Sequence, residues 1–337
     1  MRRAIELAKE GDGFTSPNPL VGAVAVLDGE IVAEGWHKKA GGPHAEIEVI
    51  NLLGVDASKC DLYVTLEPCA HIGRTGPCAE AVSSAGFKKV YVGMLDPFPA
   101  VNGLGIEFLR SKGLEVELCA DIGLIRNLRM LNQPFLKYVE TALPYVVLKA
   151  GMSLDGRTAT ASGDSQWITS KEARDDARFE RSRADAVLVG TGTVLADDCT
   201  LAAHGIYAGK NLLRVVVGHS DVLLDPGLKI FRDENVLVET SAPGEDLDLL
   251  VLLKKLAARG VRTLFVEGGA SIHGSFVDAG LVDKVIFYLA PKLLGGKSLS
   301  VIGGRGATSL DDCLEFSEME ALKVGQDLKV TAFARIY

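Results

Sequence analysis

The sequence predicts an α/β protein built from two domains. The chain has 337 residues, which is more than one typical domain and makes two the default expectation. In both halves, short apolar runs typical of buried strands alternate with segments of helical periodicity. The two patterns meet in a connecting region over 121–143, which Pro134 interrupts. We therefore expect one domain over 1–143 and a second over 144–337.

In the first half, strand and helix patterns follow one another closely. Apolar runs bounded by turn residues predict strands at 20–27, 31–33, 62–66, 90–95 and 114–118. Helical periodicity predicts helices at 2–10, 44–53, 78–85 and 105–112. Asp28-Gly29 is a tight-turn signal between the first two strands. Pro43 suits the first turn of the second helix.

The second half continues this alternation after Pro144. Strands are expected at 145–150, 186–189, 213–217, 236–238, 263–266 and 284–289. Helices are expected at 170–182, 247–259 and 271–279.

Composition favours small-molecule chemistry in the cytoplasm. The net charge is −8, whereas proteins that bind nucleic acid usually carry a basic face. No run of about 18 apolar residues predicts a membrane span. Acids at Glu6, Glu10 and Asp12 follow the first residues, and transit peptides avoid acids. The six scattered cysteines do not resemble a secreted disulfide framework. We expect no nucleic-acid partner, no membrane partner and a cytoplasmic location.

Four residues carry the main chemical prediction, which is a catalytic zinc site. His44, Cys69 and Cys78 offer one imidazole and two thiolates as zinc ligands. Three protein ligands leave one tetrahedral position open for water, whose pKa then falls to about 7. Glu46 is placed to take that water's proton and deliver it to a leaving amine. This H-x-E…P-C…C pattern is typical of zinc deaminases that act on bases.

Two other interpretations of these residues remain open. A closed structural zinc site would use four ligands, with His71 as the fourth. Such a site rarely needs an acid at position 46. The cysteines could also serve without any metal.

The loop between the cysteines narrows the family. Eight residues separate Cys69 and Cys78, against two in the short motif of zinc deaminases. Together with the runs Thr15-Ser16-Pro17-Asn18-Pro19-Leu20-Val21-Gly22 and Thr65-Leu66-Glu67, the loop resembles the bifunctional pyrimidine deaminase/uracil reductases of riboflavin biosynthesis. The resemblance runs through both halves of the chain. It implies a cytidine-deaminase-like three-layer domain followed by a dihydrofolate-reductase-like domain.

For the first half, the resemblance implies zinc-dependent hydrolysis of the ring amino group of a 2,5-diamino-6-ribosylamino-pyrimidinone 5′-phosphate. Asn18 then orients the base, and His71 and Arg74 lie near the substrate phosphate or ribose. Without the resemblance, Asn18 is a turn residue between prolines, and Arg74 is a solvated loop charge. Gly76 stands where the family is expected to have proline.

The second half contains two glycine-rich segments directly after predicted strands, at 189–198 and 266–270. Such turns expose N–H groups to a pyrophosphate. Each segment is weak by itself. In the first, Leu195 takes the place of the third glycine of a dinucleotide fingerprint, and a lone glycine pair after a strand is more often a tight turn. The resemblance implies a reductase that uses NADPH to open the ribose of the deaminated product to a ribityl chain.

The same resemblance assigns residues of the reductase half. Cofactor contacts are implied for Gly151, Trp167, Thr193, Asp197, Gly269, Ala270, Ser271, Ile272, His273, Gly274 and Ser275. Substrate contacts are implied for Lys149, Ser165, Arg181, Leu201, His204 and Glu267. Without it, Trp167 is a core aromatic and Asp197 a cap.

Positions 199 and 204 depart from the family, which is expected to have proline and a phosphate-binding arginine there. His204 cannot make the forked contact of a guanidinium, although Arg178 or Arg214 could compensate. One alternative is therefore a deaminase whose reductase half is weak. Another is a nucleic-acid base deaminase or zinc-dependent nucleic-acid-binding module, against which the acidic balance argues. The resemblance also implies a homodimer or larger assembly formed through the reductase half.

Overall fold

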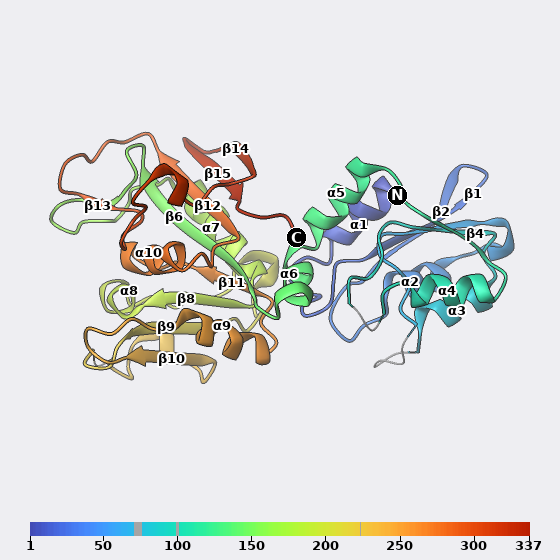
Figure 1. The fold of residues 1–337 in the computed structure, drawn as a ribbon, viewed down its shortest axis with the longest axis horizontal. Coiled ribbons are helices and arrows are strands. Elements are labelled where there is room, and N and C mark those ends of the chain that lie inside the picture. Colours follow the sequence, from blue (N-terminus) through green and yellow to red (C-terminus); the bar gives the residue numbers. More distant parts are fainter. Residues whose placement is uncertain (71–75, 99–100, 223) are drawn as a thin grey trace. The chain divides into compact units, whose positions relative to one another are not determined.

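The computed structural model describes residues 1–70, 76–98, 101–222 and 224–337. The chain forms two compact units, Met1–Thr141 together with Tyr337, and Ala142–Ile336. Tyr337 is held in the first unit by Gln133, whose Oε1 accepts a hydrogen bond from the Tyr337 N–H over 2.9 Å. Both units combine helices with a β-sheet (Figure 1), so the predicted α/β class is confirmed.

The first unit contains a five-stranded sheet in the order β2-β1-β3-β4-β5. Its strands are β1 (Gly22–Leu27), β2 (Glu30–Trp36), β3 (Asp61–Val64), β4 (Lys89–Val92) and β5 (Glu115–Leu118). Strand β1 runs antiparallel to both neighbours, whereas β3, β4 and β5 are parallel. The helices are α1 (Arg2–Lys9), α2 (Ala45–Leu52), α3 (Cys78–Ala85), α4 (Leu104–Ser111), α5 (Ile122–Leu131) and α6 (Gln133–Thr141).

Helices cover both faces of this sheet, as three layers require. Figure 1 shows α1 and α5 on one side and α2, α3 and α4 on the other. Strand β1 explains the arrangement, because successive side chains of a strand point to opposite faces. Ala23 and Ala25 enter the core shared with α2 and α3, and Val24 packs against Ala4 and Leu7 of α1.

The second unit contains an eight-stranded sheet in the order β10-β9-β8-β11-β6-β12-β15-β14. The strands from β10 through β9, β8, β11 and β6 to β12 are parallel to their neighbours. Strand β15 pairs antiparallel with β12, and β14 pairs antiparallel with β15. The strands are β6 (Tyr145–Ser153), β8 (Ala186–Gly190), β9 (Leu213–His219), β10 (Val236–Ser241), β11 (Thr263–Val266), β12 (Lys284–Ala290), β14 (Glu318–Val324) and β15 (Asp327–Phe333). A separate pair joins β7 (Arg157–Ala159) to β13 (Leu299–Ser300).

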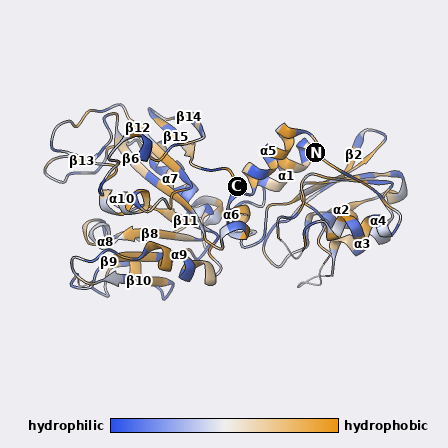
Figure 2. Ribbon diagram, in the orientation of Figure 1, coloured by the Kyte–Doolittle hydropathy of each residue, from blue (hydrophilic) through white to orange (hydrophobic). Residues whose placement is uncertain are grey.

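The second unit's helices enclose apolar cores on both faces of its sheet. They are α7 (Lys171–Arg183), α8 (Thr191–Asp197), α9 (Leu249–Ala258) and α10 (Ala270–Asp278). Strand β8, which is mostly hydrophobic in Figure 2, sends Leu188 toward α9 and α10 and Val189 toward α8. Among the described residues, no helix is long and apolar enough to span a membrane.

The expected strands are present, with ends shifted by a few residues. No helix was predicted in the connecting region over 121–143. Two helices occupy it, α5 and α6. Asp121 caps the first by accepting the Leu124 N–H over 2.9 Å. Pro134 lies in the first turn of the second, where its missing N–H has no intrahelical partner to lose.

Candidate active site

Three elements bring the predicted zinc ligands together. His44 caps the start of α2, Cys69 follows β3, and Cys78 is the first residue of α3. The Nδ1 atom of His44 lies 3.1 Å from the Cys78 Sγ and 3.7 Å from the Cys69 Sγ. All three ligand atoms lie within 4.8 Å of one another.

This geometry fits a zinc ion. Zinc–sulfur and zinc–nitrogen bonds place tetrahedral ligand atoms about 3.5 Å apart, which matches the distances found. The Cys78 N–H also donates to the Cys69 Sγ over 3.3 Å, and such contacts at a helix start favour a thiolate. No other His, Cys or acidic group of the described residues joins this set. Among the described residues, three ligands are therefore available to a metal ion, which is the number that catalytic zinc sites use.

The groups of the ligand cluster shift one another's pKa values. A hydrogen bond from Cys78 lowers the pKa of Cys69 to about 4. The same hydrogen bond raises the pKa of Cys78, and the bond with Cys69 raises the pKa of His44. Zinc binds thiolates and neutral imidazole, so zinc affinity is expected to depend on pH.

Glu46 lies in the first turn of α2, two residues after His44, and its side chain is 2% exposed. Burial raises the pKa of its carboxyl to about 7. Its Oε2 atom has no hydrogen-bond partner among the described residues. A buried carboxyl oxygen without a partner is costly, and in a cleft such a group is a candidate for proton transfer.

A cavity of about 690 Å³ adjoins this cluster, and all of its lining residues belong to the first unit. His44, Glu46 and Cys69 face it together with Asn18 and aromatic side chains. Ligand pockets typically enclose about 300–1,000 Å³. The cavity can hold a nucleotide-sized molecule beside the ligand cluster.

His37 is a site residue that the sequence reasoning missed. It is 2% exposed, lines the cavity, and contacts the His44 ring edge-on at 5.1 Å between centroids. Its Nδ1 lies 2.9 Å from the Pro43 carbonyl, and its Nε2 lies 3.1 Å from the Asn18 Nδ2. Burial lowers the pKa of His37, so the neutral ring donates to Pro43 and accepts from the Asn18 amide.

Two expected substrate contacts, His71 and Arg74, lie outside the described residues. The neighbouring Gly76 is described, and a side chain there would meet open space. Its departure from the expected proline therefore removes no contact within the described chain.

In the second unit, Lys149, Arg181 and Glu267 form one charged cluster. The Glu267 carboxylate lies 3.3 Å from the Lys149 Nζ and 3.2 Å from the Arg181 Nη1. Burial by itself would raise the pKa of Glu267, but Lys149 and Arg181 hold it below its usual value. Arg181 also donates to the Ala202 carbonyl over 3.1 Å, which ties the 199–204 segment to α7.

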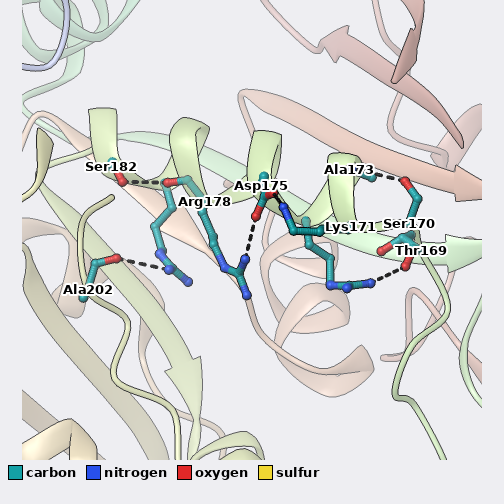
Figure 3. A network of polar contacts seen from close by, with 10 residues as sticks. Thr169, Ser170, Lys171, Ala173, Asp175, Arg178, Ser182 and Ala202 are labelled. Carbon is teal, nitrogen blue, oxygen red and sulfur yellow. Dashed lines mark hydrogen bonds and ion pairs between the residues drawn. The ribbon is translucent and has the colours of Figure 1, made fainter. Parts of the chain in front are cut away.

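His204 lies at the same end of α7. Its N–H donates to the Ser182 hydroxyl over 2.8 Å. Burial, followed by repulsion from Arg181 and Arg178, lowers the pKa of His204. Figure 3 shows Arg178, Ser182 and Ala202 along this part of the helix. Leu201 beside it is buried, with a φ of 49°.

The two cations expected to compensate for His204 have different surroundings. Arg178 pairs with Asp175 over 2.7 Å and remains close enough to repel His204. Arg214 on β9 is 1% exposed and paired with Asp233. Arg214 is therefore a buried structural residue, and the expectation that it serves as a spare cation is wrong.

The implied cofactor contacts lie on several elements of the second unit. Trp167 is 59% exposed and stacks with the Arg174 guanidinium at 4.2 Å. Asp197 at the end of α8 accepts from the Gln166 amide over 3.1 Å, while Thr193 lies within α8 and Gly151 on β6. Ser165, an implied substrate contact, lies exposed in the loop before α7.

The run from Gly269 to Ser275 forms the cap and first turns of α10. Ser271 and Ser275 are exposed, and Ala270 and Ile272 are half-buried. His273 is 1% exposed, with its Nδ1 3.1 Å from the Val301 carbonyl. Gly274 packs so closely on Gly303 that a Cβ would lie 2.4 Å from its carbonyl carbon. These two residues face the protein interior.

Family models match both halves of the chain. Residues 1–94 match the cytidine and deoxycytidylate deaminase zinc-binding region. Residues 144–330 match the RibD C-terminal domain.

Full-length relatives agree with both models. The chain is 42% identical to the riboflavin biosynthesis protein RibD of Bacillus amyloliquefaciens, covering 99% of this chain and 95% of the relative. It is 40% identical to RibD of Escherichia coli strain K12, covering 97% and 96%. Among solved structures, Acinetobacter baumannii RibD superposes with a TM-score of 0.88 at 38% identity, covering 98% of this chain and 97% of that one.

A Thermotoga maritima structure, described as a diaminohydroxyphosphoribosylaminopyrimidine deaminase/5-amino-6-(5-phosphoribosylamino)uracil reductase, has a TM-score of 0.85 at 35% identity. That match covers 99% of this chain and 97% of the other. These likenesses extend over both units and include the fold predicted for each. The chain belongs to the RibD family, the bifunctional zinc-dependent deaminases and NADPH-dependent reductases of riboflavin biosynthesis.

Proposed function

We propose that the chain catalyses two consecutive reactions on one pyrimidine. The first unit removes the ring amino group of 2,5-diamino-6-ribosylamino-4(3H)-pyrimidinone 5′-phosphate by hydrolysis. The second unit reduces the ribosyl group of 5-amino-6-(5-phosphoribosylamino)uracil to ribityl with NADPH. The observation that carries the proposal is the cluster of His44, Cys69 and Cys78 beside Glu46, at the edge of the 690 Å³ cavity.

In the first unit, a zinc ion held by this cluster supplies Lewis-acid activation of water. Glu46 moves the protons: its carboxylate accepts one from the attacking water and delivers it to the exocyclic amino group, which leaves the ring carbon as ammonia. The unpaired Oε2 of Glu46 is the atom suited to this exchange. Asn18 orients the base, and His37 holds the Asn18 amide through the hydrogen bond at its Nδ2. His71 and Arg74 contact the ribose or phosphate.

In the second unit, NADPH supplies a hydride for C1′ of the ribosylamino group. Lys149 is assigned to the ribose contact, and its ammonium lies in a half-buried charged cluster with Glu267 and Arg181. The other proposed substrate residues are Ser165, Leu201 and His204. The proposed cofactor residues are Gly151, Trp167, Thr193, Asp197, Gly269, Ala270, Ser271, Ile272, His273, Gly274 and Ser275. Of these, His273 and Gly274 face the protein interior and support the start of α10.

A second candidate is a deaminase whose reductase half is weak. His204 favours it, because an imidazole with a lowered pKa is mostly neutral at pH 7. Steady oxidation of NADPH in the presence of the deaminated substrate would rule this candidate out.

We also propose a cytoplasmic homodimer or larger assembly, formed through the reductase unit without nucleic-acid or membrane partners. Strand β14 supports the assembly, since it ends the sheet order and exposes Met319 and Leu322. Sedimentation of the wild type and of Leu322→Lys tests the interface. A larger wild-type species that Leu322→Lys does not weaken would place the interface elsewhere.

Chromatographic resolution of products tests the function directly. Zinc-loaded protein receives the diamino substrate with and without NADPH. Deaminated pyrimidine should accumulate without NADPH, and the ribityl product should form with it. Glu46→Ala should stop the first product while leaving reduction of the supplied deaminated substrate intact. Wild-type deamination by Glu46→Ala would refute the role of Glu46.

A further inference from the structure

Glu67 is a buried carboxylate that lies directly before Pro68-Cys69. Its side chain lies at the cavity wall and the residue is 4% exposed. It does not belong to the set of potential metal ligands, which holds only His44, Cys69 and Cys78 among the described residues. Its proximity to one ligand and to the cavity calls for a different role.

Backbone N–H groups surround both oxygens of Glu67. Oε1 accepts from Gly105 over 2.7 Å and from Ile106 over 3.2 Å. Oε2 accepts from Gly103 over 2.9 Å and from Asp96 over 3.1 Å. Hydrogen bonds to an ionised acceptor are about twice as strong as neutral ones. Four of them on one carboxylate make a rigid connection.

These bonds join the peptide that carries Cys69 to the segments that follow β4 and begin α4. The Glu67 N–H donates to the Met94 carbonyl, just after β4, over 3.0 Å. At the start of α4, a Cβ on Gly105 would lie 2.0 Å from the Pro68 carbonyl oxygen. Pro68 is therefore packed directly on the backbone that Glu67 holds.

The same bonds fix part of the cavity wall. Asp96 donates to Glu67 through its N–H, and Asp96, Phe98 and Val101 line the cavity. The Phe98 N–H in turn donates to the Asp96 carboxylate over 2.9 Å. One carboxylate thus connects the peptide of a proposed zinc ligand to residues that line the cavity.

We infer that Glu67 is a positioning residue that sets both zinc affinity and substrate affinity in the first unit. The inference rests on the proposed deaminase function of that unit. A glutamine at this position keeps the shape but offers only one acceptor oxygen, and its NH₂ group faces two backbone donors. Glu67→Gln should therefore loosen the Cys69 peptide and the cavity wall together.

Chelator competition on the zinc-loaded, full-length protein tests the metal side. Competition with a chromogenic chelator measures the zinc affinity. The affinity of Glu67→Gln should be about 10- to 100-fold lower than that of the wild type, the range found for groups that orient metal ligands. The KM for the diamino substrate should rise as well. The second unit should still reduce added 5-amino-6-(5-phosphoribosylamino)uracil at the wild-type rate. Glu67→Asp keeps the charge but is shorter, and should shift both readouts in the same direction by less.

Asp185→Asn is the matched control. Asp185 also accepts two backbone N–H groups, those of Arg262 and Thr263, each over 2.9 Å, but it lies in the second unit. This variant should lower thermal stability and leave zinc retention unchanged.

The outcomes separate the inference from the proposed function. Wild-type zinc retention and wild-type KM in Glu67→Gln would overturn the inference, even if the melting temperature falls. If Glu67→Gln does not fold, zinc retention by Glu67→Asp decides in the same way. If the wild type binds zinc but shows no deamination, the proposed function fails, and the retention measurements still decide the role of Glu67.

Discussion

At the scale of single residues, the first unit combines chemically active side chains with neighbours that hold them. Glu46 has an unpaired buried oxygen, whereas Asn18 is fixed by His37 and the Cys69 peptide by Glu67. Glu46 combines its unpaired oxygen with a place at the cavity, beside the ligand cluster. That combination fits a group that exchanges protons with a substrate.

His37→Leu tests the fixation of Asn18. The variant removes the acceptor of the Asn18 amide and leaves the Pro43 carbonyl without its donor. Loss of one such hydrogen bond costs about 1 kcal/mol, so the deaminase KM should rise about five- to tenfold while zinc content stays unchanged. Steady-state kinetics with metal analysis measure both. His219→Leu, an exposed histidine of the second unit, is the control, and an equal effect there would contradict the role of His37.

His204→Arg should tighten substrate binding in the reductase step. Burial and nearby arginines lower the pKa of His204, so the imidazole is mostly neutral at pH 7 and gains charge only at lower pH. An arginine is charged throughout this range. The fall in KM should therefore be large at pH 8 and shrink toward pH 5. An unchanged or raised KM at pH 8 would count against a phosphate contact at this position.

At the scale of elements, close backbone packing holds the first unit's layers together. Helix α1 approaches β1 so closely that a Cβ on Gly22 would lie 2.0 Å from the Ala4 carbonyl oxygen and 2.8 Å from the Ala8 nitrogen. Because these neighbours are backbone atoms, they cannot rotate away. The position of α1 therefore depends on the absence of a side chain at residue 22.

Gly22→Ala should destabilise the first unit by about 3 kcal/mol, the upper part of the range for overpacking. Urea unfolding followed by loss of deaminase activity measures the change. Gly54→Ala is the matched control, because a Cβ there meets nothing within 4 Å. It should change stability by no more than about 0.5 kcal/mol. Equal stability of the two variants would contradict the packing argument.

Elements with a strong local pattern were predictable, and those defined by distant partners were not. Strands such as β8 have continuous apolar runs, whereas β14 is mostly exposed and owes its place to pairing with β15. Apolar residues recur along one face of both α5 and α6, but Asn132, Gln133 and Pro134 were interpreted as an interruption of a connecting region, so neither helix was predicted.

The same distinction applies to the site. His44, Glu46, Cys69 and Cys78 were predictable because residue type and spacing express their chemistry. His37 gave no signal by itself, since its partners are a carbonyl six residues away and an amide on another loop. Glu67 stood in a recognised motif, yet its partners are backbone N–H groups that no sequence pattern marks.

At the scale of the whole molecule, the two activities belong to two compact units with separate cores. The described ligand cluster and its cavity consist of first-unit residues alone, and the charged cluster around Glu267 of second-unit residues. Each site should therefore respond to its own perturbation.

Zinc removal should separate the activities. Dialysis against a chelator should abolish deamination and leave NADPH oxidation with the deaminated substrate within about twofold of the untreated enzyme. Adding zinc back should restore deamination. Parallel loss of both activities, not recovered with zinc, would show that the metal supports the whole chain and would contradict the separation.

The measurement that tests the central claim most directly is the isotopic mass of the final product. Zinc-loaded enzyme converts the diamino substrate in heavy-oxygen water with NADPH deuterated on the transferred face. The account predicts one solvent oxygen on the pyrimidine ring and one deuterium at C1′ in the same molecule, with neither formed from the diamino substrate by Glu46→Gln. A ribityl product without solvent oxygen, or a wild-type enzyme that introduces the oxygen but never the deuterium, would contradict it.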